Sequence, residues 1–358
     1  MTTQRYIKKE DVSFSGGFGQ VTLLHDTYLG RNVLYKSMSS PDFNDQLYNE
    51  IKALSGARSR HVVEIYDVIF DEDKNINGII IEYLNGRNFT SFYDDFEKKH
   101  DVDYFLQILF QLSKALSDIH SAGITHRDLK LDNIKSSSSG IIKVFDFGLS
   151  TSQDDYITRS NRGTWIYAAP ELYQDDVIIS KEMDIYAFGI CAWALVTKLA
   201  NFSPALLENP PMSRSVYTSI KSVLNNHVDQ EIINILDKTL SINPNDRPTA
   251  KNINQVLSRH MLLNKHKGLF VENFNQVYEL SVSKKGVKIT LTFGEITVQY
   301  TGLDFIVKSH SGDVYINNIP VTSDYILPNS CLITFGEPSL KSRRRFITFL
   351  SSHPEIVL

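Results

Sequence analysis

Three polar side chains near the middle of the chain have the types and the spacing needed to handle a metal–phosphate group. Asp128 and Asn133 lie in HRDLKLDN, and Asp146 lies in VFDFG, eighteen positions after Asp128. The carboxylate of Asp128 can accept a proton or align a hydroxyl nucleophile. The oxygens of Asn133 and Asp146 are hard ligands of the kind that magnesium prefers. The combination predicts a site that orients a hydroxyl and holds divalent metal against a polyphosphate.

The segments around these residues must place them close together. Apolar runs on both sides, SKALSDIHSAGIT before and GIIKVFDF after, predict a helix, a tight loop and a short hairpin. Residues 102–121 carry apolar side chains at helical spacing on one face, namely Phe105, Leu109, Leu112, Leu116 and Ile119. Two further strands, separated by the turn DEDKNIN, are expected within residues 61–84.

A glycine-rich stretch near the start of the chain is a second candidate for phosphate contact. Residues 12–38 alternate as a twisted antiparallel sheet does, with a turn expected at Tyr28 to Arg31. Gly16, Gly17 and Gly19 lie in the first turn, where their backbone amides can point at phosphate oxygens. The alternative is a glycine-rich turn with no ligand. Lys36, fifteen residues after Val21, favours the functional interpretation.

The order and spacing of these motifs resemble those of eukaryotic-type (Hanks-type) serine/threonine protein kinases. The resemblance implies an α+β, bilobal protein kinase fold over residues 5–262, with a β-rich N-lobe over about 5–84 and an α-helical C-lobe over about 85–262. It also implies ATP and magnesium as cofactors. The kinase pattern would place a first glycine at position 14, where this chain has Phe14. We therefore expect an altered loop conformation that still permits nucleotide binding.

The resemblance also implies roles for individual residues. Asp128 would position the nucleophile, and Lys130 would neutralise charge on the transferring group. Asn133 and Asp146 would hold magnesium. The nucleotide would contact residues from the first lobe: Gly16, Gly17, Gly19, Val21, Lys36 with its partner Glu50, and the hinge-like segment Glu82 to Leu84, with Ile81 behind it. The alternatives are a surface lysine for Lys36 and a structural acid for Glu82.

Further matches to the family would support the site without touching ATP. Ala169, Pro170 and Glu171 match a closing motif, and Arg247 would pair with Glu171. Asp184 would brace the catalytic loop. The polar stretch LSTSQDDYITRSNRGT, which lies between Gly148 and Ala169, is expected to be a mobile loop.

That loop contains the expected site of regulation. Arg127 precedes Asp128, a pair that in the family goes with an activating phosphate on this loop. Ser160 is the first candidate for the phosphate and Thr158 the second, while Thr164 resembles the serine/threonine branch. The alternative is that Ser160 is a plain polar loop residue.

Residues 267–358 have a different sequence pattern, in which short runs of alternating apolar and polar residues recur about every ten residues. This pattern predicts a small all-β, sandwich-like domain. The second half resembles a forkhead-associated domain, with Asn317 at a ligand-contacting position and Asn318 where the family has glycine. The arginine and serine that bind phosphothreonine in that family have no counterpart in the first half. A β-sandwich that packs on the kinase or on a protein partner therefore remains open. Ser342 to Arg345 is expected to be a solvated hairpin.

Composition limits the other classes of function. The chain has 358 residues, 42% of them hydrophobic, which is enough for two packed domains. A net charge of −4 gives no general signal for nucleic acid or membrane, and we expect neither as a partner. Cys191 and Cys331 lie far apart in apolar runs, so we expect no disulfide and a cytoplasmic location. The longest apolar run, Ile185 to Val196, is too short for a membrane span.

The leading functional hypothesis is a kinase that transfers the γ-phosphoryl of ATP to Ser/Thr hydroxyls of protein substrates, including its own activation loop. A pseudokinase that serves as a scaffold or binding module is the alternative, supported by Phe14. A small-molecule phosphotransferase that shares the fold is a third hypothesis, which the closing motif and Thr164 disfavour.

Overall fold

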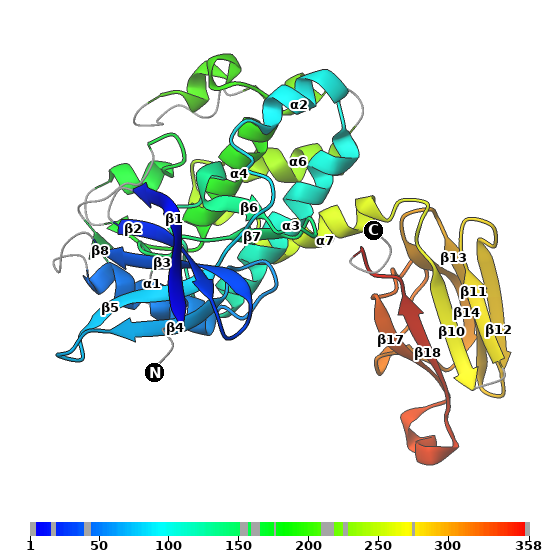
Figure 1. Ribbon diagram of the computed structural model, residues 1–358. Coiled ribbons are helices and arrows are strands. Elements are labelled where there is room, and N and C mark those ends of the chain that lie inside the picture. Colours follow the sequence, from blue (N-terminus) through cyan, green and yellow to red (C-terminus); the bar gives the residue numbers. More distant parts are fainter. Residues whose placement is uncertain are drawn as a thin grey trace. The chain divides into compact units, whose positions relative to one another are not determined.

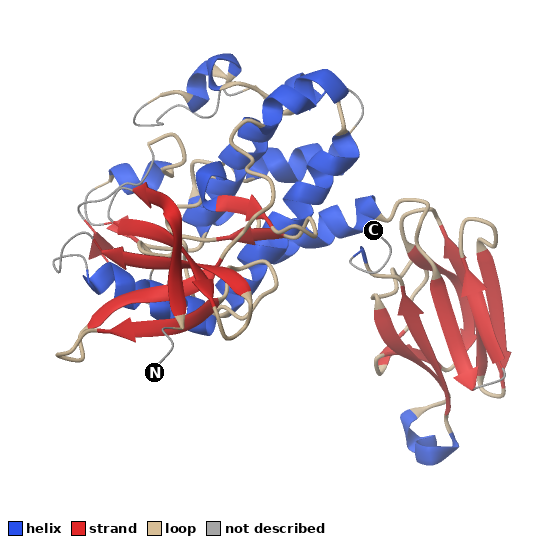
Figure 2. Cartoon of the chain, viewed as in Figure 1, coloured by secondary structure: helices blue, strands red, loops and turns tan. Residues whose placement is uncertain are grey.

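The computed structural model describes residues 5–15, 19–38, 44–150, 157–158, 165–174, 177–208, 218–224, 228–273 and 276–354. The chain divides into two compact units, Met1–Asn254 and Gln255–Leu358. The first unit combines a β-sheet with helices, and the second is made mainly of strands (Figures 1 and 2).

The first unit begins with a five-stranded antiparallel sheet. Its strands are β1 (Tyr6–Ser15), β2 (Gly19–Asp26), β3 (Arg31–Met38), β4 (Ile65–Phe70) and β5 (Ile76–Glu82), in the order β1-β2-β3-β5-β4. Helix α1 (Asn44–Gly56) packs against β3, β4 and β5. The strands expected on both sides of DEDKNIN are confirmed as β4 and β5. Gly16 and Gly17 lie outside the described residues, whereas Gly19 begins β2 opposite Met38.

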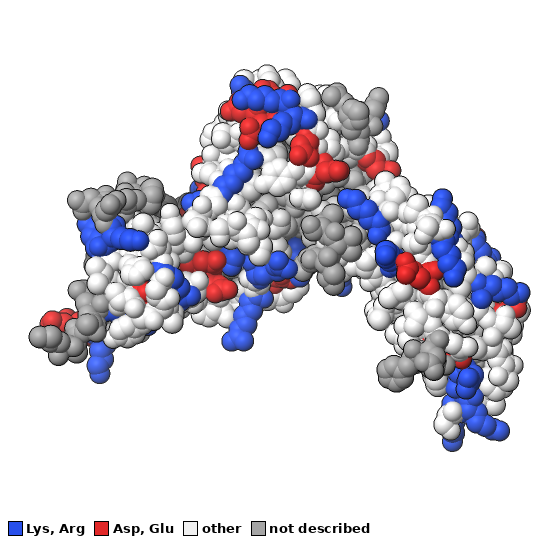
Figure 3. All heavy atoms as spheres, turned by 45° about the vertical axis from the view of Figure 1, so that its right-hand side comes forward, with Lys and Arg blue, Asp and Glu red and all other residues white. Residues whose placement is uncertain are grey.

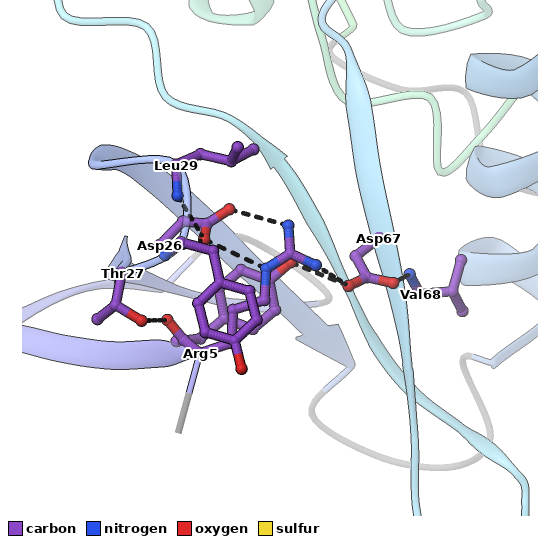
Figure 4. A network of polar contacts seen from close by, with 8 residues as sticks. Arg5, Asp26, Thr27, Leu29, Asp67 and Val68 are labelled. Atoms are coloured by element: carbon purple, nitrogen blue, oxygen red, sulfur yellow. Dashed lines mark hydrogen bonds and ion pairs between the residues drawn. The ribbon is translucent and has the colours of Figure 1, made fainter. Parts of the chain in front are cut away.

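A polar network links the residue before β1 to the β2–β3 turn and to β4 (Figure 4). The guanidinium of Arg5 donates to both carboxylate oxygens of Asp26, at 3.2 and 3.0 Å, and to Asp67 Oδ2 at 3.2 Å. Asp26 also accepts from the backbone N–H groups of Tyr28 and Leu29 in the β2–β3 turn. The hydrogen bond from Arg5 holds the pKa of Asp26 below its usual range. The network therefore fixes the residue before β1 to the β2–β3 turn and to β4.

Helices dominate the rest of the first unit. They are α2 (Phe92–Lys99), α3 (Val102–Ser121), α4 (Glu182–Val196), α5 (Lys221–Leu224), α6 (Gln230–Lys238) and α7 (Ala250–Met261), the last of which continues into the second unit. The predicted helix 102–121 is confirmed as α3, and the carboxylate of Asp101 caps it by accepting from Tyr104 N–H at 3.0 Å. Its apolar face is buried, including Phe105, Leu109 and Leu116.

Short strands connect the helices. The hairpin β6 (Ile134–Ser136) and β7 (Ile142–Val144) follows the 3-10 turn Leu131–Asn133, as the sequence predicts. Two residues of the stretch expected to be a loop instead form β8 (Ile157–Thr158), which pairs with β9 (Val177–Ile178). That expectation was wrong for these two residues, because polar neighbours conceal a two-residue strand. The rest of the stretch from Thr151 to Thr164 lies outside the described residues.

The apolar run at 185–196 is confirmed as a buried helix. It makes up most of α4, whose Cys191 is a fully buried free thiol. Cys331, in the second unit, is also free and buried, so the expectation of no disulfide is confirmed. No helix within the described residues has the length and apolar character that crossing a membrane would require.

A buried ion pair joins the segment before α4 to the turn before α7. Both nitrogens at the end of the Arg247 side chain donate to Glu171, Nη1 to Oε1 at 2.6 Å and Nη2 to Oε2 at 2.7 Å. The remaining donors of Arg247 reach the backbone carbonyls of Ser241, Ile242 and Glu182. The predicted Glu171–Arg247 pair is thus confirmed, with every N–H of the guanidinium satisfied.

The second unit contains two antiparallel sheets around one core. A six-stranded sheet has the order β11-β10-β18-β17-β15-β16, and a three-stranded sheet has the order β12-β13-β14. The strands are β10 (Gly268–Asn273), β11 (Gln276–Leu280), β12 (Gly286–Leu291), β13 (Gly294–Tyr300), β14 (Phe305–Gly312), β15 (Val314–Ile316), β16 (Ile319–Pro320), β17 (Ser330–Phe335) and β18 (Arg345–Ser351). Both sheets contribute to the core, for example Phe270 and Phe349 from one and Val298 from the other. Strand β10 was not predicted.

Residues expected at a ligand surface have structural contacts in this unit. Asn317 has a φ of 48° and accepts from Leu332 N–H at 2.9 Å, which fixes the β15–β16 turn to β17. Asn318, with a φ of 67°, adopts the left-handed conformation expected of it. In the basic stretch, Arg344 donates to Gly336 O and Arg345 pairs with Glu272. Figure 3 shows Lys and Arg side chains scattered among Asp and Glu side chains over the visible face of the molecule.

Replacing Arg247 with Met should destabilise the first unit by about 3–5 kcal/mol, because the carboxylate of Glu171 would remain buried without its partner. Denaturant unfolding followed by circular dichroism measures this loss. The double variant Glu171→Met with Arg247→Met should recover part of it, since no buried charge remains. Lys198→Met, which breaks the exposed pair with Asp94, should cost less than about 1 kcal/mol. Equal losses for Arg247→Met and Lys198→Met would contradict the assignment.

Candidate active site

A cavity of about 680 Å³ lies between the five-stranded sheet and the β6–β7 hairpin. Its volume is typical of small-molecule sites. Most of the residues selected from the sequence line it: Val21, Lys36, Glu50, Ile81, Glu82, Leu84, Asp128, Lys130, Asn133 and Asp146. Of the three glycines, Gly19 is not among the lining residues, and Gly16 and Gly17 lie outside the described residues. The structure therefore brings together side chains up to 125 positions apart, from Val21 to Asp146.

One end of the cavity holds a cluster of three charged groups. The ammonium of Lys36, from β3, lies 2.6 Å from Glu50 Oε2 and 2.8 Å from Asp146 Oδ1. Helix α1 supplies Glu50, whose side chain is fully buried. The predicted Lys36–Glu50 pair is confirmed.

The cluster shifts the pKa values of its members. Burial alone would lower the pKa of Lys36, but the carboxylates of Glu50 and Asp146 raise it above its usual value. Burial would raise the pKa of Asp146, and Lys36 lowers it below its usual range. Lys36 is therefore a fixed cation, and Asp146 is ionised at neutral pH.

The second group of the site lies in the loop that follows α3. Lys130 Nζ is 2.6 Å from Asp128 Oδ2, and Asn133 Nδ2 donates to Asp128 O at 2.8 Å and to Asp128 Oδ2 at 3.1 Å. The Asp128 carboxylate is thus held by an ammonium and an amide. A carboxylate fixed in this way can orient a hydroxyl group that enters the cavity.

Asp184, at the start of α4, fixes the backbone of this loop. Its carboxylate accepts from the N–H groups of His126 and Arg127, each at 2.8 Å, and His120 Nε2 lies 2.9 Å from Oδ2. Burial would raise the pKa of Asp184, but His120 and these N–H donors keep it below its usual value. The expected bracing role of Asp184 is confirmed.

Two residues of the site have backbone conformations that residues other than glycine rarely adopt. Arg127 has a φ of 70° and Asp146 a φ of 65°. Arg127 also donates to the carbonyl of Leu149 at 3.2 Å, so the residue before Asp128 is tied to the segment after Asp146. Strain of this kind persists only where surrounding contacts over-determine the backbone, as they do here.

The end of β5 and the segment after it also line the cavity, with Glu82, Tyr83, Leu84 and Gly86. The side chain of Glu82 pairs with Lys143 Nζ at 2.7 Å, so the carboxylate is a structural acid, as the sequence alternative proposed. Glu82 N–H donates to Glu64 O. Further along, Gly86 N–H donates to Ser136 O and Arg87 N–H to Ser136 Oγ, which attach this segment to β6.

The donor set suits a divalent cation. Asp146 presents an ionised carboxylate, and both hydrogen bonds of the Asn133 amide use its nitrogen, so the amide oxygen keeps its capacity as an acceptor in a residue that lines the cavity. Magnesium prefers carboxylate and carbonyl oxygens of this kind. Asn133 and Asp146 therefore fit such an ion, as the sequence predicts.

Sequence reasoning missed three polar residues that line the cavity: Gln46, Asn88 and Lys135. A signal existed for Lys135. It lies two positions after Asn133, in the short strand β6 that directly follows the 3-10 turn Leu131–Asn133.

Comparisons with known proteins agree with this site. The chain is 32% identical over 205 residues to "Probable serine/threonine-protein kinase WNK10" of Arabidopsis thaliana, covering 54% of this chain and 38% of that protein. It is 32% identical to "Probable serine/threonine-protein kinase CA_C1728" of Clostridium acetobutylicum, covering 54% and 30%. It is 27% identical to "Receptor-interacting serine/threonine-protein kinase 1" of Homo sapiens, covering 67% and 39%. The chain thus spans less than two fifths of the length of these relatives.

The family described as "Protein kinase domain" matches residues 12–257, which is more than half of the chain. This range contains every residue that lines the cavity. The chain therefore belongs to the protein kinase domain family.

Proposed function

We propose that this chain is a serine/threonine protein kinase that transfers the γ-phosphoryl of ATP to hydroxyl groups of protein substrates and of its own activation loop. The observation that supports the proposal most is the convergence of Lys36, Asp128, Asn133 and Asp146 on one cavity. Membership of the family and the names of its relatives point in the same direction.

The geometry supports a division of roles along the cavity. The backbone of Glu82 to Leu84 would bind the adenine, while Val21 and the glycine-rich turn would cover the phosphates. Lys36 would hold the phosphates, because its ammonium is fixed by Glu50 and aimed at the end where Asp146 lies. Asn133 and Asp146 would hold magnesium, which when bound neutralises charge on the phosphates.

Asp128 would act on the accepting substrate. Its carboxylate would accept a hydrogen bond from the Ser or Thr hydroxyl and orient the oxygen for attack. Lys130, 2.6 Å from that carboxylate, would place positive charge next to the transferring group. The five intact residues Lys36, Glu50, Asp128, Asn133 and Asp146 argue against a scaffold that lacks turnover.

We propose that residues 5–262 form the kinase domain and that residues 267–358 form a forkhead-associated-like domain that binds the kinase domain or a protein partner. We further propose that the protein is cytoplasmic. The two sheets with a common core support the second assignment. The carboxamide oxygen of Asn317 is engaged by Leu332 of the same domain, which disfavours the usual peptide contact.

Purified protein supplied with magnesium and γ-labelled ATP should label itself or an added protein substrate. Asp146→Asn should abolish the transfer, and Lys36→Ala should reduce it on the order of 10²-fold or more, because both residues act mainly on charge in the transition state. Lys251→Ala, at an exposed position of α7, is the matched control and should retain activity. Equal labelling by Asp146→Asn and the unmodified protein would eliminate the enzyme and promote the scaffold.

Phosphate on Ser160 or Thr158 should activate the kinase. A phosphate adds about −1.5 to −2 charges and accepts one to three charge-assisted hydrogen bonds, and Arg127 lies at the base of this segment. The double variant Ser160→Ala with Thr158→Ala should lower activity toward an added substrate about tenfold or more. Mass spectrometry of the expressed protein locates the phosphate.

Ser150 and Ser152 bear on this assignment in different ways. Ser150 is buried and its hydroxyl donates to Phe147 O at 2.6 Å, which disfavours it as the phosphate acceptor. Ser152→Ala is the matched control and should leave activity unchanged. An unmodified loop together with full activity of the double variant would show that this switch does not exist.

Phosphothreonine peptides should not bind the full-length protein at micromolar concentration, since the arginine and serine that would bind the phosphate have no counterpart. A peptide array or fluorescence polarisation with a phosphothreonine library measures this. Micromolar binding that is lost on Asn317→Ala would show that residues 267–358 recognise phosphothreonine after all.

A further inference from the structure

The cavity contains three lysines, and their charges are compensated differently. Lys36 contacts two carboxylates and Lys130 contacts one. The third, Lys135, has its Nζ 5.7 Å from the centre of the Tyr83 ring, and no carboxylate contact of its ammonium is found among the residues that the structure describes. Of the three lysine ammonium groups in the cavity, that of Lys135 therefore has the most N–H donors left for a bound ligand.

The backbone around Lys135 is held firmly. Lys135 pairs with Lys143 in the β6–β7 hairpin and forms a β-bridge with Asn88 on its other side. The next residue, Ser136, binds the backbone of Gly86 and Arg87. The side chain of Lys135 thus starts from a fixed point, and only its own rotamers decide where the ammonium lies.

That fixed point lies close in sequence to the proposed metal ligand Asn133. Lys135 is in β6, two residues after Asn133, which ends the preceding 3-10 turn; two residues of extended chain span about 6–7 Å. The Tyr83 ring that its ammonium approaches belongs to the segment proposed to bind the adenine. A nucleotide with its phosphates at Lys36 and its base at Glu82 to Leu84 would place its sugar over this part of the cavity.

Resting on the proposed function, we propose that Lys135 binds the sugar of the nucleotide, its ammonium donating a hydrogen bond to a ribose hydroxyl. The alkyl stem would cover the cavity floor while the charged end reaches the rim, as long cationic side chains commonly do. The phosphates lie at the other end, beside Lys36. Adenine offers only ring nitrogens as acceptors, whereas the ribose carries hydroxyl groups, so the sugar is the group that offers oxygens to Lys135.

The test is a binding cycle that needs no phosphoryl transfer. Calorimetry measures the dissociation constants of ADP, 2′-deoxy-ADP and 3′-deoxy-ADP for the full-length protein and for Lys135→Met, with magnesium present. Loss of one hydroxyl should weaken binding to the unmodified protein about tenfold, as expected for a hydrogen bond to a charged group. Lys135→Met should bind ADP about tenfold more weakly, and loss of that hydroxyl should then change affinity less than about twofold.

Two further variants and three outcomes complete the test. The dissociation constant of ADP for Lys135→Gln, which keeps a polar end, should fall between those for Lys135→Met and the unmodified protein. The constant for Lys251→Met should match that of the unmodified protein.

An equal effect of the hydroxyl on affinity with and without Lys135 would overturn the inference while leaving the kinase proposal intact. A changed preference for ADP over GDP without hydroxyl coupling would assign Lys135 to the base and also overturn it. Failure of the unmodified protein to bind any nucleotide would remove both proposals.

Discussion

The contact between Lys36 and two carboxylates determines how the first unit can function. Glu50 comes from α1, Lys36 from β3 and Asp146 from the segment after β7, so three elements meet at one ammonium. Because Glu50 is fully buried, its charge would be costly without this partner. Beside this pair, the pKa of Asp146 is lowered, so its carboxylate is ionised. The same contact therefore positions the sheet and α1 against the segment after β7.

The loop that carries Asp128 depends on Asp184 in a comparable way. One carboxylate accepts two consecutive backbone N–H groups, those of His126 and Arg127, and thereby sets the direction in which the chain enters Asp128. The Glu171–Arg247 pair then secures the segment before α4, the helix that carries Asp184. Asp184 and Arg247 thus both bind backbone groups, whereas Lys36, Asp128 and Asp146 line the cavity.

The sequence predicts the parts of this arrangement whose physics is local or whose spacing is distinctive. The 3.6-residue pattern of α3 and the pairs Lys36–Glu50 and Glu171–Arg247 were predicted and are present. Contacts that depend on tertiary placement could not be predicted: Glu82 and Lys143 are sixty-one positions apart, and no motif indicates that their side chains pair. Strand β10 was missed because the alternation of apolar and polar residues around Phe270 is short. Its place between β11 and β18 comes from pairing with residues that are distant in the sequence. Lys135 was missed because a lysine on a short strand usually faces solvent.

The left-handed backbone at Arg127 and Asp146 places the stability of the fold in conflict with the geometry of the site. Each such residue costs roughly 1–3 kcal/mol relative to a relaxed conformation, and that energy is released when the chain unfolds. A glycine at position 127 would relieve this strain, but it would also remove the side chain that donates to Leu149 and loosen the loop that carries Asp128. Relief of strain at this position would therefore be obtained at the expense of loop geometry. An engineer who seeks a more robust version of this protein should make changes in the sheet and in α3 and leave these two positions alone.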